Sequence, residues 1–278
     1  MILPENFNYS QKSLQDFVYC RRLFKYRYID RINWPAVELD PVNELELRAK
    51  SGADFHRAVH QYFAGVSEEK IEDYLVDSSL KKWWDNFKIS IIKNLDEADK
   101  FLPEVRLYSV IQGFRVIAKL DLVAIKPDGR WIIYDWKTSK IRYKSGVLGE
   151  HFQSKVYPYI LFCAGKHLCP SKRIEPDQLK MIYWFAEYPW NMEIFEFDKY
   201  KLTQAKDEIG NTIEKISGMN PEEFLKTDQE VKCKFCVYRA LCERGDLPGQ
   251  GGVANELIFS EESAQYEYDF DQIVEIEF

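Results

Sequence analysis

The chain has 278 residues, of which 46% are hydrophobic and 15% aromatic, enough to bury a large core in one big domain or two modest ones. Its formal net charge of −7 at first argues against a nucleic-acid partner. Eight acidic residues and no Lys or Arg lie in 254–278, however, so the other residues carry a net +1 and can form basic patches. We see neither a run of membrane-spanning length nor a leader in residues 1–10, and expect a cytoplasmic protein without a membrane partner.

The N-terminal part of the chain has helical periodicity. A Ser13–Asp16 segment that resembles a capping box predicts a helix start, with Cys20 in the middle of that helix. Further helices are expected over 44–64, ended by Gly65, and in two pieces between 68 and 101, with Pro103 closing the helical section. Basic residues after Cys20 form either a solvated face or a phosphate-contacting face, and both interpretations stay open: Arg21, Arg22, Lys25, Arg27 and Arg31.

Two histidines, His56 and His60, lie four residues apart in the helix expected over 44–64, and therefore on one face. Taken alone, such a pair is more often structural than metal-binding. Gly52 in the same helix costs stability, which indicates that another element packs closely there.

Runs of β-branched and aromatic residues predict the start of a sheet after this helical section. A strand over 104–110 is followed by a turn at 112–113 and a long strand over 114–125. A Pro-Asp-Gly turn at 127–129 then leads into a strand over 131–135, so the last two strands form a β-hairpin.

One carboxylate interrupts each apolar strand of this hairpin, Asp121 in the first and Asp135 in the second. A carboxylate in a buried strand is costly unless something pairs with it. Lys137 follows Asp135 by two residues and therefore lies on the same strand face. An ordinary salt bridge explains Asp135 and Lys137 taken alone. Two carboxylates and a lysine on one face also indicate a site for a hard cation with a positive charge beside it.

A helix is expected next over 148–163, with Gln153 and Tyr157 on one face and a kink at Pro158. The rest of the core is predicted from its periodicity as strands over 180–186 and 191–197 and a helix over 201–216.

Three late cysteines, Cys233, Cys236 and Cys242, are spaced as C-x2-C-x5-C, which is a strong sign of metal binding. Cys20 is the available fourth thiolate. Sulfur ligands of this kind suit zinc or an iron–sulfur cluster, and either would staple the two ends of the chain together. The other two cysteines are interpreted as small core residues: Cys163 and Cys169.

In their order and spacing these motifs resemble the PD-(D/E)XK nuclease superfamily, in particular its iron–sulfur branch of RecB-like and AddB-like nuclease domains and CRISPR-associated adaptation nucleases. The resemblance covers about Tyr9 to Arg244. It implies an α/β fold, a restriction-endonuclease-like core with a central mixed β-sheet flanked by helices. We divide the chain into an N-terminal helical section (1–103) with Cys20 and His56, a nuclease core (104–217), a cysteine-cluster segment (218–246) and an acidic tail (247–278).

The resemblance also implies roles for individual residues. His60 and Arg21 depart from the pattern, where the family often has Glu and Pro, but neither is a core catalytic position. The implied sets are Asp121, Asp135, Lys137, Gln153 and Tyr157 for catalysis; His56, Asp121 and Asp135, with Glu104 as a further candidate, for Mg²⁺ or Mn²⁺; and Cys20, Cys233, Cys236 and Cys242 for a [4Fe-4S] cluster, with Zn²⁺ as the alternative.

The implied activity is metal-dependent hydrolysis of DNA, on single strands or at ends, by an exonuclease rather than an endonuclease, leaving 5′-phosphates. The context would be DNA repair, recombination or CRISPR-type defence, with a helicase or a CRISPR adaptation protein as partner. The alternatives are a non-catalytic DNA-end-binding scaffold of a helicase–nuclease complex and a zinc-stapled interaction protein. Tyr143 and Trp136 are candidates to stack bases, with core packing the favoured role of Trp136. The acidic segment from Ala254 either mimics a nucleic-acid strand or is a solvated tail.

Overall fold

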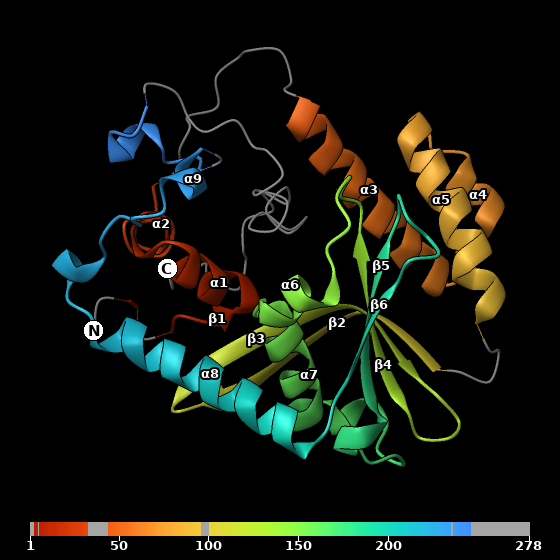
Figure 1. The fold of residues 1–278 in the computed structure, drawn as a ribbon. Coiled ribbons are helices and arrows are strands. Elements are labelled where there is room, and N and C mark those ends of the chain that lie inside the picture. The colour runs from red at the N-terminus through yellow and green to blue at the C-terminus, as the bar shows by residue number, and fades with distance from the viewer. Residues whose placement is uncertain (1–2, 5, 33–43, 96–99, 235, 246–278) are drawn as a thin grey trace, which may run out of the picture.

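A six-stranded mixed β-sheet with helices on both faces forms the centre of the molecule (Figure 1). The computed structural model describes residues 3–4, 6–32, 44–95, 100–234 and 236–245, with side chains in the helix at 44–63 described from Lys50 onward. The expected α/β class is confirmed. The strands are β1 (Tyr9–Ser10), β2 (Lys100–Ile111), β3 (Phe114–Ile125), β4 (Trp131–Lys137), β5 (Leu179–Phe185) and β6 (Glu193–Glu196).

The long strand β3 organises the sheet. One edge of β3 pairs with β2 along its whole length, in antiparallel fashion. Its other edge pairs in parallel with β1 near Val116 and antiparallel with β4 from Leu122 onward. The sheet then continues through β5, parallel to β4, and ends at β6. Both predicted turns are present, and Gln112 and Gly113 adopt the two positive φ angles that a two-residue hairpin loop requires.

Helices cover the two faces of the sheet unequally. One face carries α7, which contacts β2, β3 and β5, together with α1 and α8 packed beside it. The other face carries α3 and α5 (Figure 1). The helices of the described chain are α1 (Gln11–Tyr19), α2 (Arg21–Phe24), α3 (Glu44–Phe63), α4 (Glu68–Glu72), α5 (Ser78–Ser90), α6 (Ser145–Glu150), α7 (Gln153–Ala164), α8 (Lys199–Gly218) and α9 (Glu230–Cys233).

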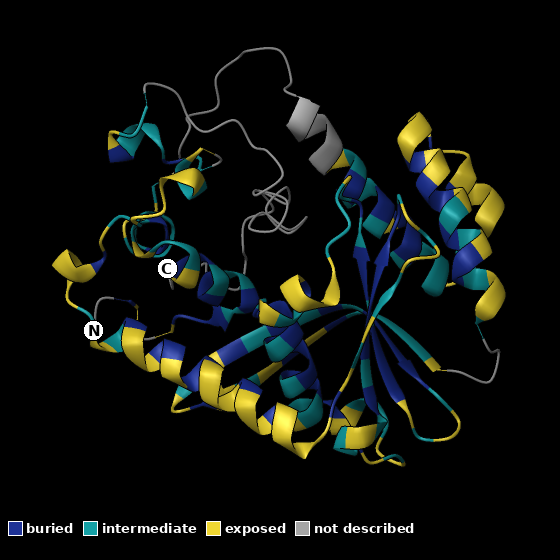
Figure 2. Ribbon diagram, viewed as in Figure 1, coloured by how far each residue is buried: buried dark blue, intermediate teal, exposed yellow. Residues whose placement is uncertain are grey.

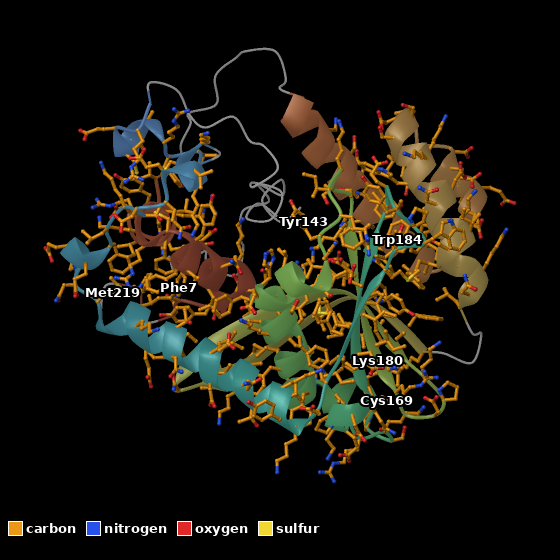
Figure 3. All side chains as sticks on the ribbon, viewed as in Figure 1. Phe7, Tyr143, Cys169, Lys180, Trp184 and Met219 are labelled. Carbon is orange, nitrogen blue, oxygen red and sulfur yellow. The ribbon has the colours of Figure 1, made fainter. Side chains whose placement is uncertain are left out.

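Two apolar cores result, one on each face of the sheet. Alternate residues of β4 and β5 point to opposite faces, so Ile133 and Tyr183 enter the core under α7 whereas Trp136 and Trp184 enter the core under α3 and α5. Figure 3 shows Trp184 on β5 at this second interface. The buried residues concentrate on the strands and inner helix faces, while the outer face of α8 is exposed (Figure 2).

The N-terminal prediction was wrong in two details. Ser10, not Ser13, caps α1: Ser10 Oγ accepts from Ser13 N at 3.2 Å, and Ser13 Oγ accepts from Ser10 N at 2.9 Å. Ser13 is thus the third helical residue of this capping box. Cys20 is not within a helix but in extended backbone between α1 and α2, at φ −161°.

Three further predictions were wrong. Pro103 does not close the helical section; it lies within β2, opposite Leu122. The helix expected over 148–163 is split into α6 and α7, and Pro158 sits inside α7. Cys163 is exposed and therefore not a core residue, whereas Cys169 is half-buried against the core under α7.

None of the helices that the structure describes combines the length and apolarity needed to cross a bilayer. The acidic segment from Ala254, with its suggested mimicry of nucleic acid, lies outside the described residues.

The core under α3 and α5 is expected to depend on Phe87. Its ring is fully buried and contacts the rings of Phe55, Trp136 and Trp184. Phe87→Ala should lower the free energy of unfolding by about 3–5 kcal/mol, because a large cavity opens among aromatic rings. Urea unfolding measures the loss, with the exposed Tyr200→Ala as the matched control. A loss below about 1 kcal/mol would contradict this packing.

Candidate active site

Asp121 and Asp135 are brought together by strand register. Leu122 pairs with Tyr134 in the antiparallel β3–β4 ladder, which sets Asp121 opposite Asp135. Asp121 Oδ2 accepts from the backbone N–H of Trp136 at 3.0 Å, and Asp121 Oδ1 lies 3.5 Å from His56 Nδ1 of α3. His56, Asp121 and the start of the Asp135–Lys137 segment, from α3, β3 and β4, therefore meet at one point.

The alternation of buried side chains shifts at Asp121. Along β3, Ala118 and Leu120 face the core under α7, but from Val123 onward the odd-numbered residues do so. Glu104, which stands opposite Asp121 in the β2–β3 register, has φ +52°. Its carboxylate contacts Lys119 Nζ at 2.6 Å. This local twist puts Asp121 within reach of α3, while Glu104 is engaged by a lysine.

Asp135, Lys137 and Gln153 form a closed triangle. Lys137 Nζ lies 2.7 Å from Asp135 Oδ1 and donates to Gln153 Oε1 at 2.9 Å. Gln153 Nε2 donates to Asp135 Oδ2 at 2.6 Å. Gln153 is the first residue of α7, and Tyr157, one turn later, is buried in the core under α7. The predicted Gln153–Tyr157 face thus points toward the sheet, and Gln153 reaches the carboxylate.

The two carboxylates are held in different electrostatic states. Burial raises the pKa of Asp135 to about 7; Lys137 opposes this rise, and the charge of Asp121 adds to it. Burial also acts to raise the pKa of Asp121. The charge of His56, the hydrogen bond from Trp136 N–H and the charge of Lys137 outweigh burial and hold this pKa below its usual range. One carboxylate is therefore ionised at neutral pH while its neighbour is poised to titrate.

The donor types at this point suit a hard divalent cation. Two carboxylates on facing strands with an imidazole beside them are oxygen and nitrogen ligands of the kind Mg²⁺ and Mn²⁺ accept. A buried carboxyl whose pKa is near 7 is also one that a cation would ionise by replacing its proton. Within the described ranges, no group of three or more His, Cys, Asp or Glu side chains is gathered closely enough to coordinate a metal, here or at the cysteines.

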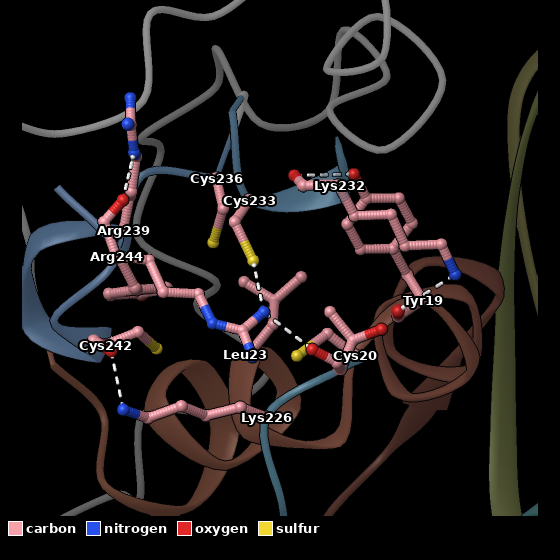
Figure 4. Close-up of a pocket in the computed structure, with 12 residues that line it drawn as sticks. Tyr19, Cys20, Leu23, Lys226, Lys232, Cys233, Cys236, Arg239, Cys242 and Arg244 are labelled. Carbon is pink, nitrogen blue, oxygen red and sulfur yellow. Dashed lines mark hydrogen bonds between the residues drawn. The ribbon is translucent and has the colours of Figure 1, made fainter. Parts of the chain in front are cut away.

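The late cysteines do converge with Cys20. All four predicted sulfur ligands line one cavity of about 20 Å³ near the N-terminal helices (Figure 4). Arg244 Nη1 donates to Cys233 Sγ at 3.1 Å inside it. Burial raises the pKa of Cys236 to about 12, and negative charge at Cys20 and Cys242 acts in the same direction. Cys236 is therefore held as a thiol at neutral pH.

One of the five basic residues after Cys20, Arg27, serves neither predicted role. Arg27 Nη1 lies 2.6 Å from Oδ2 of the fully buried Asp16, and Tyr28 donates to the same oxygen at 2.8 Å. Lys25 pairs with Asp30 at 2.7 Å. Arg27 therefore neutralises a buried charge rather than contacting phosphate.

His151 was missed in the sequence. It lies between α6 and α7, half-buried, and its pKa is lowered to about 4 by burial and by the charges of Lys137 and Lys155. Its imidazole is thus neutral at physiological pH and near the Lys137 ammonium. In the sequence, His151 is distinguished only by lying two residues before Gln153. That position is too weak a signal to identify it as a site residue.

Comparison with known proteins identifies the family of the chain. The family model of the PD-(D/E)XK nuclease superfamily matches residues 8–243, so the chain belongs to this superfamily. It is also similar to a crystal structure from Eubacterium rectale whose description proposes an exonuclease, with 12% identity, TM-score 0.48, and 76% of this chain and 80% of that chain covered. A second similar structure, SSO0001, gives 16% identity, TM-score 0.34, and 71% and 93% coverage. No curated protein matches the chain.

The raised pKa of Asp135 predicts a specific pH dependence of stability. Because the folded pKa lies above the unfolded value of about 4, the folded state binds the extra proton between those values, and this contribution to stability is lost as pH rises from about 4 to about 7. In metal-free buffer, the stability of wild type relative to Asp135→Asn should fall over this window by up to about 1.4 kcal/mol per pH unit.

Urea unfolding at a series of pH values checks this, with the exposed Asp177→Asn as the control. A difference that rises with pH, or that does not change between pH 4 and pH 8, would contradict the assignment of the raised pKa to Asp135.

Proposed function

We propose that this protein is a metal-dependent deoxyribonuclease whose active site is the Asp121–Asp135 pair with Lys137 and Gln153. The observation that supports it most is the closed triangle of Asp135, Lys137 and Gln153 facing Asp121 across the β3–β4 ladder. A plain structural ion pair requires neither a second buried carboxylate opposite it nor a glutamine clamping both partners. Membership of a nuclease superfamily supports the same reading.

Each residue is assigned a role by its position. Asp121 and Asp135, with His56, would hold Mg²⁺ or Mn²⁺, which when bound supplies an acidified water and charge neutralisation at the phosphate. Lys137 would orient the attacking water and neutralise charge that develops on the phosphate oxygens. Gln153 fixes Asp135 and Lys137 relative to each other, and Tyr157 supports the first turns of α7. Glu104, opposite Asp121 on β2 and paired with Lys119, is a further candidate ligand.

We further propose that the four cysteines hold a metal centre that joins the two ends of the chain. Tyr19 already donates to Lys232 O at 2.9 Å and Tyr238 to Ile32 O at 2.9 Å across this junction. A [4Fe-4S] cluster is the first assignment. Zn²⁺ is the alternative, and a cavity of about 20 Å³ has room for about one ion without movement of Arg244.

The finer assignments are part of the same proposal. We propose action on single-stranded DNA or DNA ends as an exonuclease, in the cytoplasm, in repair, recombination or CRISPR-type defence with a helicase or adaptation protein as partner. We also propose a division into a helical section (1–103) packed on the core, a nuclease core (104–217), a cysteine-cluster segment (218–246) and an acidic tail (247–278).

Removing Lys137 should abolish cleavage without unfolding the protein. Lys137→Met is expected to lower the Mg²⁺- or Mn²⁺-dependent cleavage rate of a labelled oligonucleotide by at least about 100-fold, because charge stabilisation at the phosphate is lost. The matched control is Lys180→Met, which removes a lysine paired with Glu196 far along β5 (Figure 3) and should retain the wild-type rate.

Circular dichroism verifies the fold of both variants. Equal cleavage by wild type and Lys137→Met would contradict the assigned site. Binding of DNA by the wild type without cleavage under any divalent cation would instead favour the scaffold alternative.

The cysteine centre has its own test. Protein purified without oxygen is expected to be brown, to absorb near 400 nm and to contain about four Fe per chain. Cys236→Ala should lose the metal and unfold at lower temperature, whereas the exposed Cys163→Ala should keep both. Metal analysis and thermal melting provide the readouts. One Zn per chain would establish the alternative, and metal-free protein of unchanged stability would contradict both.

A further inference from the structure

Two exposed aromatic side chains lie on the connection between β5 and β6. Tyr188 is 40% exposed and Trp190 is 67% exposed. The connection begins directly after Phe185, which is in register with Lys137, and Ala186 N donates to Lys137 O at 2.8 Å. The two rings therefore project from the end of the sheet that carries Lys137, between three and five residues beyond the last paired position.

This connection is held from both sides. Toward α5, Asn86 Nδ2 donates to Ala186 O at 2.7 Å, and Glu187 accepts from Trp83 Nε1 at 3.1 Å. Toward the segment after β4, Tyr188 Oη donates to Lys140 O at 2.8 Å. Both segments leave the sheet on the same side (Figure 1). The rings are thus exposed on a fixed support, which lowers the entropic cost of using them for binding.

A second tie completes this support. Arg142 donates from Nε to Asn191 O at 3.2 Å and from Nη2 to Glu193 at 2.5 Å. This joins the far end of the connection, where β6 begins, to the segment after β4.

The charge around these rings is positive. Residues 137–149 contain four basic residues and no acidic one. The one acidic residue of the connection, Glu187, lies 2.6 Å from Lys82 Nζ, and Glu193 at the start of β6 is paired with Arg142. Lys140 and Lys144 are exposed on the neighbouring segment. Exposed aromatic rings beside cationic side chains are the combination that binds single-stranded nucleic acid, with bases stacked on the rings and phosphates near the cations.

We propose that Tyr188 and Trp190 form a base-stacking site that holds the single strand leading into the Asp121–Asp135 site. This inference rests on the proposed nuclease function and specifies its substrate: a strand whose bases are unstacked, since the faces of paired bases are covered in a duplex. It also replaces the two aromatic candidates from the sequence. Trp136 is 1% exposed and cannot stack on a base, and Tyr143 is half-buried against the core under α7.

The test measures binding of a labelled single strand of 15 nucleotides. Fluorescence anisotropy monitors the binding, in EDTA so that the strand is not cleaved. Trp190→Ala and Tyr188→Ala should each weaken binding by at least about 5-fold, as loss of one stacked base predicts. Trp190→Phe should retain most of the affinity. Affinity for a blunt duplex should change less than 2-fold. The slope of affinity against salt should also be unchanged, because neither ring contacts a phosphate through charge.

The matched control is Tyr200→Ala on α8, whose ring is 69% exposed but lies on another part of the fold. A second readout uses tryptophan emission. Five tryptophans are at most 1% exposed, so the exposed, quenchable emission of the described residues comes from Trp190. Oligonucleotide should quench wild-type emission, and Trp190→Phe should remove that quenching while it still binds.

Unchanged single-strand affinity in both alanine variants would overturn the stacking site, as would equal losses for single strand and duplex or an equal effect of Tyr200→Ala. If these rings instead dock a protein partner, single-strand affinity would be unchanged in both alanine variants. Failure of the nuclease function is distinguishable, because wild type would then not cleave the oligonucleotide with Mg²⁺ or Mn²⁺, whereas the stacking site is tested by binding in EDTA.

Discussion

The contact between the buried Asp135 carboxylate and its two clamps, Lys137 and Gln153, is the constraint on which the rest of the site depends. A carboxylate that is 3% exposed is costly to ionise, and the fold does not fully compensate it, since its pKa stays near 7. The burial cost of Asp135 is tolerated because Lys137 on β4 and Gln153 on α7 fix the orientation of its carboxylate. The remaining burial cost is the one that the proposed divalent cation would relieve.

The two cores explain why the site is fixed so firmly. Trp136 and Trp184 lock one face of β4 and β5 against α3 and α5, while Val156 and Ile160 of α7 pack on the other face. His56 comes from the first layer and Gln153 from the second. The two carboxylates therefore contact side chains from both layers. A change in the packing of α3 alters the distance from Asp121 to His56, and a change in the packing of α7 alters the distance from Asp135 to Gln153.

Much of the fold could be predicted from local pattern. The hairpin carrying Asp121 and Asp135 followed from apolar runs and one turn, and the facing of Asp135 and Lys137 followed from strand periodicity. Predictions were wrong where one residue type is compatible with two local structures. Pro103 suggested a helix end but is tolerated in β2, and Ser13 suggested a cap although Ser10 fills that place.

What the sequence could not supply depends on long-range geometry. The exposure of Trp190 follows from how β5 and β6 connect. The lowered pKa of His151 follows from its burial and from two lysines brought close by the fold. The twist at Asp121, which lets α3 contact it, involves Glu104 on another strand. None of these has a signature in local spacing.

Calorimetric titration of Mn²⁺ into metal-free protein at pH 6, repeated in buffers of different ionisation enthalpy, tests most directly whether the carboxylate pair is a cation site. We predict binding with a proton release that is larger at pH 6 than at pH 8, because the cation displaces the proton held by Asp135. Asp135→Asn should lose both the binding and the proton release. Binding of Mn²⁺ without proton release at pH 6, or equal binding by Asp135→Asn, would contradict the account.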